Sequence, residues 1–142
     1  MLFRMRCILI LLIVCVSLSA QDSAAEIRAL LEGQSAAWNR GDIEDFMDGY
    51  LRSSDLHFLG EQGLTSGWHA TLQRYQSTYP DTATMGKLRF ELRELTQRTD
   101  DVYTVVGRYF LERQTLEALN GYFLLVVLRT ADGWKIAADS TH

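Results

Sequence analysis

Apolar residues recur at helical spacing in the first half of the chain and at strand spacing in the second half. Between Ser23 and Arg40 one helical face carries four apolar residues, and Gln34 falls on the same face. The apolar residues are Ile27, Leu30, Leu31 and Trp38. Gly41 is expected to end this helix, and Asp42 to cap a short second helix. The inner face of that second helix carries Ile43, Phe46, Met47 and Tyr50.

A short strand pair and a third helix follow. Residues 55–60 alternate as a strand, with Phe58 on one side and His57 on the other, and Leu64-Thr65 begins a second strand. Ser66 is expected to cap the third helix, which Pro80 ends. One stripe of this helix carries Trp68, Leu72, Tyr75 and Tyr79 at spacings of four, three and four.

The remaining residues predict four consecutive strands. Residues 87–98 alternate apolar and polar, residues 102–113 form the next strand, and residues 121–141 form a hairpin around Asp132-Gly133. Phe123, Leu125 and Val127 would face the helices, whereas Tyr122, Leu124, Val126 and Leu128 would face away from them. The sequence therefore predicts one α+β domain, residues 21–142, with helices on one face of a curved antiparallel sheet.

The first twenty residues have the pattern of a secretory signal peptide. Arg4 and Arg6 precede an apolar run, and small residues end at Ala20. We expect cleavage after Ala20 and export to the periplasm or the medium, with an uncleaved membrane anchor as the alternative. Cleavage removes both cysteines and changes the formal charge from −4 to −6. An acidic domain without a basic cluster is a poor partner for nucleic acid, and no stable membrane span is expected after cleavage.

Several short stretches, in this order, resemble the SnoaL-like and ketosteroid-isomerase-like domains of the nuclear transport factor two superfamily. They are Trp38-Asn-Arg-Gly-Asp42, Tyr50 before the first strand, Gly63-Leu-Thr-Ser-Gly67 and Asp132-Gly-Trp-Lys-Ile136. The resemblance implies a cone-shaped domain whose sheet, antiparallel with mixed pairing, wraps around three N-terminal helices and leaves a pocket at its open end. It also implies a homodimer that pairs through the outer face of the sheet.

The catalytic residues of the steroid-isomerase branch are not carried over. The position of its carboxylate base is held by Phe58, which cannot accept a proton, and its hydrogen-bonding tyrosine is replaced by Gln34. Related domains often end in Asp-His-Thr, whereas this chain has Asp139-Ser140-Thr141 with His142 after it.

The candidate ligand-binding residues are polar or aromatic side chains expected near the pocket: Gln34, Trp38, Tyr50, Phe58, Trp68, Tyr75 and Arg108. Core packing alone also explains the aromatic residues, without a pocket. Arg108 either binds an acidic ligand or forms a structural ion pair with a carboxylate such as Asp139. The candidate catalytic residues are Asp139 and His142.

Three functions stay open on the sequence alone. The preferred one is an exported domain that binds a small hydrophobic or amphipathic molecule. The alternatives are an isomerase, cyclase or hydratase-like enzyme that uses Asp139, His142 or Gln34, and a dimeric interaction module. No cofactor is expected, and no metal site, because His57, His69 and His142 lack ligand spacing.

Overall fold

The helices precede the four long strands along the chain, as the periodicity predicts. The computed structural model describes residues 2–142, with side chains from residue 20 onward. The elements are α1 (Leu2–Asn39), α2 (Ile43–Met47), β1 (His57–Gly60), β2 (Gly63–Ser66), α3 (Trp68–Thr78), α4 (Thr82–Met85), β3 (Lys87–Thr99), β4 (Val102–Glu112), β5 (Leu119–Thr130) and β6 (Gly133–Thr141). The predicted α+β class is confirmed. Except for Ala20, the predicted signal peptide at residues 1–20 lies outside the described side chains.

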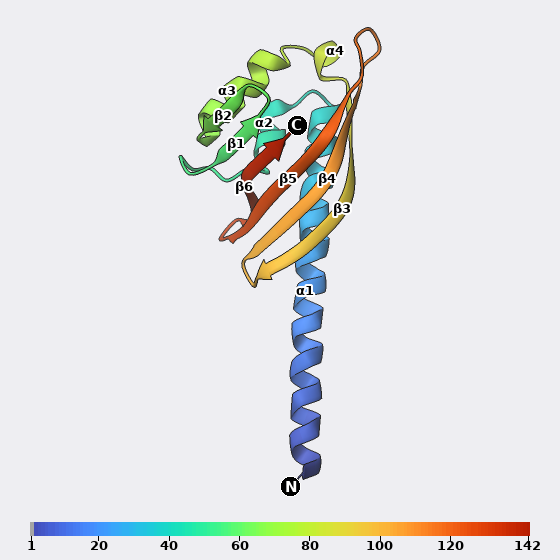
Figure 1. The fold of residues 1–142 in the computed structure, drawn as a ribbon, viewed down its shortest axis with the longest axis vertical. Coiled ribbons are helices and arrows are strands. Elements are labelled where there is room, and N and C mark those ends of the chain that lie inside the picture. The colour runs from blue at the N-terminus through green and yellow to red at the C-terminus, as the bar shows by residue number, and fades with distance from the viewer. Residues whose placement is uncertain (1) are drawn as a thin grey trace.

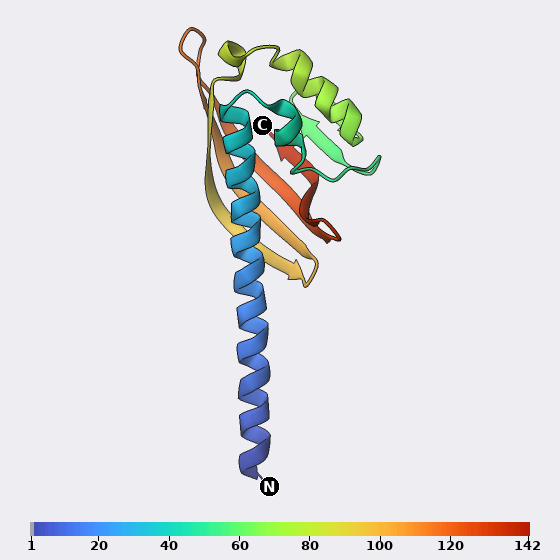
Figure 2. The same cartoon turned by 180° about the vertical axis from the view of Figure 1, so that it is seen from behind.

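The six strands form one curved, open sheet in the order β2-β1-β6-β5-β4-β3. All neighbours are antiparallel except β1 and β6, which run parallel. Register shifts interrupt β3 after Leu92 and Gln97, and β6 between Ile136 and Ala138. Because such irregularities bend a strand, the sheet curls and presents a concave face to α1 (Figures 1 and 2).

The hairpin of β5 and β6 has the predicted two-sided character. Phe123, Leu125 and Val127 are buried on the concave side, while Tyr122 and Leu124 expose 59% and 47% of their surface on the outer side. Gly133 supplies the positive φ, 94°, at the turn. On β4, Gly107 lies opposite Phe123. A Cβ at residue 107 would come within 2.5 Å of the Phe123 ring, so glycine lets this ring cover the strand.

The helix ends follow the predicted capping with one correction. Gly41 has a φ of 83°, and the Asp42 carboxylate accepts a hydrogen bond from the Asp45 amide at 2.9 Å. The N-cap of α3 is Gly67, not Ser66. Ser66 is the last residue of β2, and its pairing with His57 holds it in an extended conformation. The sequence interpretation also missed α4, which Asp81 caps by accepting from the Thr84 amide.

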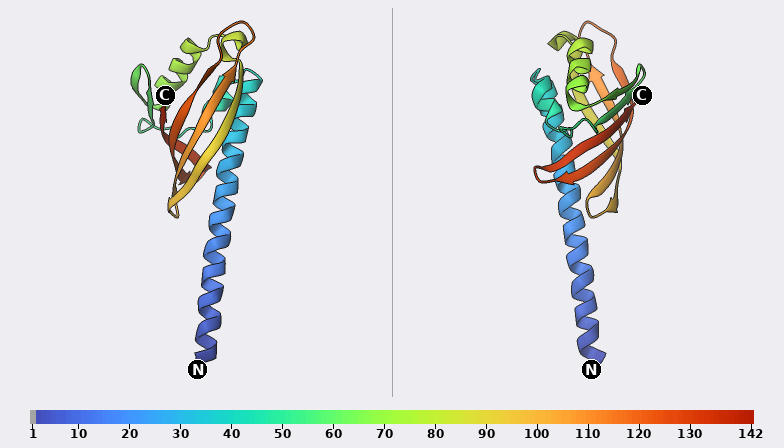
Figure 3. Two further views of the ribbon diagram at one scale, coloured as in Figure 1. Left: turned by 45° about the vertical axis from the view of Figure 1, so that its right-hand side comes forward. Right: turned by 90° about the vertical axis from the view of Figure 1, so that its left-hand side faces the viewer.

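Helix α3 and the β1–β2 hairpin lie at one end of the sheet, beside the C-terminal end of α1 (Figure 3). The residue Tyr50, which follows α2, forms a bridge to Ile136 in β6. Helix α3, the β1–β2 hairpin, the end of α1 and the Tyr50 segment together enclose one end of the concave face. Within the part of the chain whose side chains are described, no helix is long and apolar enough to cross a membrane.

Candidate functional site

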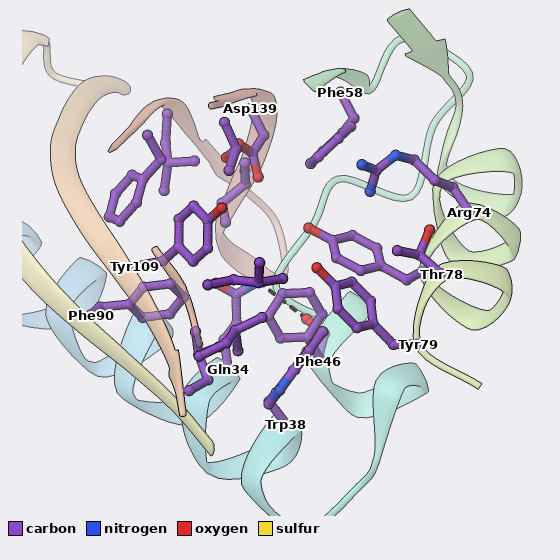
Figure 4. Close-up of a pocket in the computed structure, with 18 of the residues that line it drawn as sticks. Gln34, Trp38, Phe46, Phe58, Arg74, Thr78, Tyr79, Phe90, Tyr109 and Asp139 are labelled. Atoms are coloured by element: carbon purple, nitrogen blue, oxygen red, sulfur yellow. Dashed lines mark hydrogen bonds between the residues drawn. The ribbon is translucent and has the colours of Figure 1, made fainter. Parts of the chain in front are cut away.

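A cavity of about 310 Å³ lies between the concave face of the sheet and the helices. Figure 4 shows side chains from both sides converging on it. Its walls come from α1, α2, α3 and strands β1 and β3–β6. The lining includes Leu31, Gln34, Trp38, Phe46, Tyr50, Phe58, Arg74, Tyr75, Thr78, Tyr79, Leu88, Phe90, Tyr109, Leu111, Phe123, Leu125, Ile136, Asp139 and Thr141. Glu61 and Gln62 of the β1–β2 turn and His142 line it as well.

Edge-to-face aromatic contacts build one wall. The Trp38 ring lies 5.1 Å from Phe46 and 4.9 Å from Tyr79, measured between ring centroids. Tyr75 meets Phe46 at 5.2 Å and Phe58 at 5.7 Å in the same geometry. These contacts join α1, α2, β1 and α3, so the wall is a packed assembly.

A buried carboxylate, Asp139, occupies the strand side of the cavity. Its Oδ2 accepts a hydrogen bond from the Tyr50 hydroxyl at 2.6 Å, and its Oδ1 accepts one from the Thr141 hydroxyl at 2.5 Å. The hydroxyls of Tyr50 and Tyr75 are 3.3 Å apart. Because the single Tyr50 proton points to Asp139, Tyr75 is the donor to Tyr50. The network therefore runs from Tyr75 through Tyr50 to Asp139.

Burial governs the acid–base properties of this network. Desolvation raises the pKa of Asp139 above its ordinary value, while the hydrogen bonds from Thr141 and Tyr50 and the charge of Arg74 act against the rise. Burial also raises the pKa of Tyr50 and of Tyr75, and the nearby Asp139 charge adds to both shifts. Both tyrosines therefore stay neutral hydroxyls, and Asp139 is the group of the three that can change its charge.

Arg74 projects from α3 toward the cavity (Figure 4). Its guanidinium carbon lies 4.1 Å from the centroid of Phe58 and 5.5 Å from that of Tyr75. The side chain is half-buried and forms no hydrogen bond or ion pair with the part of the chain that the structure describes. It supplies positive charge to the cavity.

Further polar atoms in the lining lack a protein partner. Gln34 donates its amide to the Phe46 carbonyl at 3.2 Å, but its oxygen has no donor among the described residues. The hydroxyls of Tyr79 and Tyr109 likewise have no hydrogen bond within the described chain. Gly49 leaves room for the Gln34 side chain, because a Cβ at residue 49 would come within 2.7 Å of the amide nitrogen.

Five of the seven candidate ligand-binding residues lie together on the cavity: Gln34, Trp38, Tyr50, Phe58 and Tyr75. Asp139 is there also. His142 reaches the rim, with its Nε2 3.0 Å from the Ser140 hydroxyl.

The structure corrects the expected placement of Trp68 and Arg108. Trp68 donates to the Met47 carbonyl at 2.9 Å and packs beneath Arg52, away from the cavity. Arg108 lies on the outer face of β4, because its neighbours Gly107 and Tyr109 face inward. It bonds to Asn120 and lies near the rings of Phe110 and Tyr122, so the considered pair with Asp139 does not form.

The sequence interpretation left three important lining residues out of its candidate site. Arg74 immediately precedes Tyr75 on the third helix, but the apolar stripe drew attention to the aromatic positions alone. Tyr109 faces inward with Leu111, but both faces of β4 carry apolar residues, so the register against the neighbouring strands is needed to identify it. Phe90 is one of the apolar positions of the predicted alternation at residues 87–98, but that alternation does not link it to the cavity.

Comparisons with known proteins identify the family. No protein-family model matches the sequence, and no curated protein matches it. Among solved structures, an NTF-2 like protein of unknown function from Shewanella oneidensis MR-1 is 35% identical, with a TM-score of 0.78 over 82% of this chain and 96% of that chain.

Two further structures share the fold at lower identity. A ketosteroid isomerase-like protein from Erwinia carotovora atroseptica SCRI1043 is 21% identical, with a TM-score of 0.63 over 82% of this chain and 92% of that chain. An NTF2-like protein of unknown function from Pseudomonas putida KT2440 is 17% identical, with a TM-score of 0.67 over 85% and 86%. The match to the Shewanella protein, over nearly the whole of that chain, shows that this chain belongs to the NTF2-like superfamily.

Proposed function

We propose that the protein is an exported domain that holds a small hydrophobic or amphipathic molecule in the Asp139 cavity. The observation that carries this proposal is a cavity of about 310 Å³ whose wall combines aromatic rings with unpartnered polar atoms. Small-molecule sites are mostly apolar clefts of roughly 300–1,000 Å³ with a few placed polar groups. The cavity is at the small end of that range, which favours a compact ligand.

The export part of the proposal rests on the signal-like pattern of residues 1–20. Cleavage after Ala20 leaves Ser23 in the mature chain, where its hydroxyl accepts a hydrogen bond from Arg129 at 2.8 Å. Sequencing the N-terminus of protein recovered from the periplasm or the medium tests this step. The expected first residue is Gln21, and recovery of the uncut chain from the membrane fraction would support the anchor alternative.

A neutral apolar dye tests the pocket directly. We expect N-phenyl-1-naphthylamine to bind with a stoichiometry of one dye per chain, detected by its fluorescence enhancement. Thr78→Trp places an indole at the cavity lining and should weaken binding about tenfold or more, because a bulky side chain occupies ligand space. Ser77→Trp is the matched control, since Ser77 is exposed on the same helix and does not line the cavity. Equal affinities of the two variants would place the dye elsewhere.

The homodimer is proposed on the outer sheet face. Tyr122 and Leu124 are strongly exposed there, with Val126 and Leu128 beside them on β5. Leu59 and Leu64 continue the apolar surface on β1 and β2, with 42% and 62% exposure. Monomeric proteins rarely leave a contiguous apolar surface of this kind uncovered.

Sedimentation at micromolar concentration should therefore show a dimer. Leu124→Glu places a charge within the proposed interface and should weaken dimerisation about tenfold or more. Leu116→Glu is the matched control, because Leu116 is also 47% exposed but lies in the β4–β5 connection. A monomeric wild-type protein at high micromolar concentration would refute the dimer.

Proton transfer, in an isomerase, cyclase or hydratase-like reaction, is the second candidate. The specific observation in its favour is a buried carboxyl group on the cavity whose pKa burial raises. A carboxylate with a raised pKa is a stronger base than an ordinary one. The two carboxylate oxygens of Asp139 already accept hydrogen bonds from Tyr50 and Thr141. Because protein donors engage both oxygens, ligand binding remains the first proposal and proton transfer the second.

The pH dependence of the stability of Asp139→Asn, compared with that of the wild type, tests whether the pKa of Asp139 is raised in the folded protein. Because the folded pKa lies above the unfolded value, the folded state retains a proton that the unfolded chain has released. Wild-type protein should lose stability relative to Asp139→Asn as pH rises from about 4 through the folded pKa. Above the folded pKa, the difference in the free energy of unfolding between the two proteins should be constant. Urea unfolding between pH 3.5 and 8 measures this difference.

Asp132→Asn makes the same chemical change at an exposed turn and controls for net charge. A stability difference between wild type and Asp139→Asn that does not change with pH would remove Asp139 as the proposed base.

A further inference from the structure

Arg74 forms no ion pair with any described residue, whereas several other arginines of the domain do. Arg40, Arg52 and Arg129 form ion pairs with Asp45, Asp48 and Asp101. These three cations lie in strongly exposed positions, where pairing contributes little. Arg74 is half-buried on the cavity wall and still forms no ion pair or hydrogen bond with any described residue. A partly desolvated cation in this position is a site for an anion from outside the protein.

The surroundings hold the guanidinium in one orientation. The Phe58 ring lies 4.1 Å from its central carbon, and the Tyr75 ring lies 5.5 Å away. Gly60 leaves room beside it, because a Cβ at residue 60 would come within 3.0 Å of Arg74 Nη2. Stacking against a ring occupies the flat face of a guanidinium and leaves its edge N–H groups free to donate. A planar carboxylate matches two such donors.

We propose that the ligand of the cavity is an amphipathic carboxylate, with its carboxylate on Arg74 and its apolar body among the aromatic rings. The inference rests on the proposed binding function and names the class of molecule bound. The apolar body would contact Phe90, Tyr109 and Tyr79, which line the same cavity.

The other charged groups of the cavity restrict the charge of the ligand. Asp139 already accepts two hydrogen bonds from the protein, which compensate for its lost hydration. Arg74 has no such hydrogen bond with a described residue, so an anionic ligand is favoured over a cationic one. Asp139 and Glu61 also line the cavity and repel a second negative charge. One available cation and two nearby carboxyl groups favour a monoanion over a phosphate monoester.

Four naphthalene compounds with different head groups test this charge preference. Titration calorimetry of the full-length protein would compare 2-naphthoate, 2-naphthamide, 2-naphthylmethylammonium and 2-naphthyl phosphate. We expect 2-naphthoate to bind most tightly. Arg74→Met keeps much of the apolar part of the side chain and removes its charge. It should therefore lower the affinity for 2-naphthoate about 10- to 100-fold and change the affinity for 2-naphthamide little. Arg74→Lys should recover part of the loss.

Two further variants provide controls. Arg52→Met removes an arginine stacked 4.0 Å over Trp68, outside the cavity, and should leave 2-naphthoate binding unchanged. Glu61→Gln removes a negative charge from the lining and should strengthen 2-naphthoate binding a few-fold. Circular dichroism verifies that each variant is folded, and the wild-type series decides the charge preference even if Arg74→Met does not fold.

Each contrary result has a separate meaning. Equal binding of 2-naphthamide and 2-naphthoate overturns the carboxylate assignment and leaves the proposed binding function intact. Tightest binding of the ammonium compound assigns the site to a cation, and tightest binding of 2-naphthyl phosphate assigns it to a phosphate monoester. If none of the four compounds binds but the neutral dye does, the carboxylate assignment fails alone. If the dye also fails to bind, the proposed function fails with it.

Discussion

The curvature of the sheet is the constraint from which the cavity follows. Register shifts in β3 and β6 bend the strands, so the concave face surrounds more space than α1 alone fills. Helices α2 and α3 and the β1–β2 hairpin close part of the remainder with aromatic side chains. Edge-to-face contacts of Trp38 and Tyr75 hold these elements together, and those rigid contacts prevent the wall from collapsing into the remaining space. The cavity therefore results from the same packing that stabilises the domain.

Asp139 links this packing to the chemistry of the cavity. A buried carboxylate is unfavourable unless hydrogen bonds compensate for lost hydration, and here Tyr50 and Thr141 supply them. Tyr50 reaches Asp139 because the segment after α2 forms a bridge to Ile136 on the same strand. Tyr75 extends the network to α3. One group of hydrogen bonds thus fixes the relative positions of three elements and places a titratable carboxyl beside the unpaired charge of Arg74.

Much of the fold follows from periodicity, whereas the site follows only in part. The period of two along a strand placed Phe123 and Tyr122 of β5 on opposite faces, although both faces are apolar, and a polar residue on an apolar helical face was enough to find Gln34. The same reasoning failed for Arg108, which was considered as part of the pocket because its strand is otherwise apolar. Both faces of β4 carry apolar residues, so composition does not reveal the inner face without the register of the neighbouring strands. Trp68 and Tyr75 share a helical stripe and are both buried, but only Tyr75 lines the cavity, and tertiary contacts alone separate the two positions.

The alternation of β6 also changes the meaning of the C-terminus. Asp139 and Thr141 face the cavity, whereas Ser140 lies between them in the strand and pairs opposite Leu124, a residue of the outer face. The position at which similar domains often carry histidine therefore belongs to the outer side of this sheet. Replacing that histidine with serine removes nothing from the cavity of this protein, so the substitution is not an argument against catalysis. The cavity itself favours binding, because protein donors engage both oxygens of Asp139 while Arg74 forms no ion pair or hydrogen bond with a described residue.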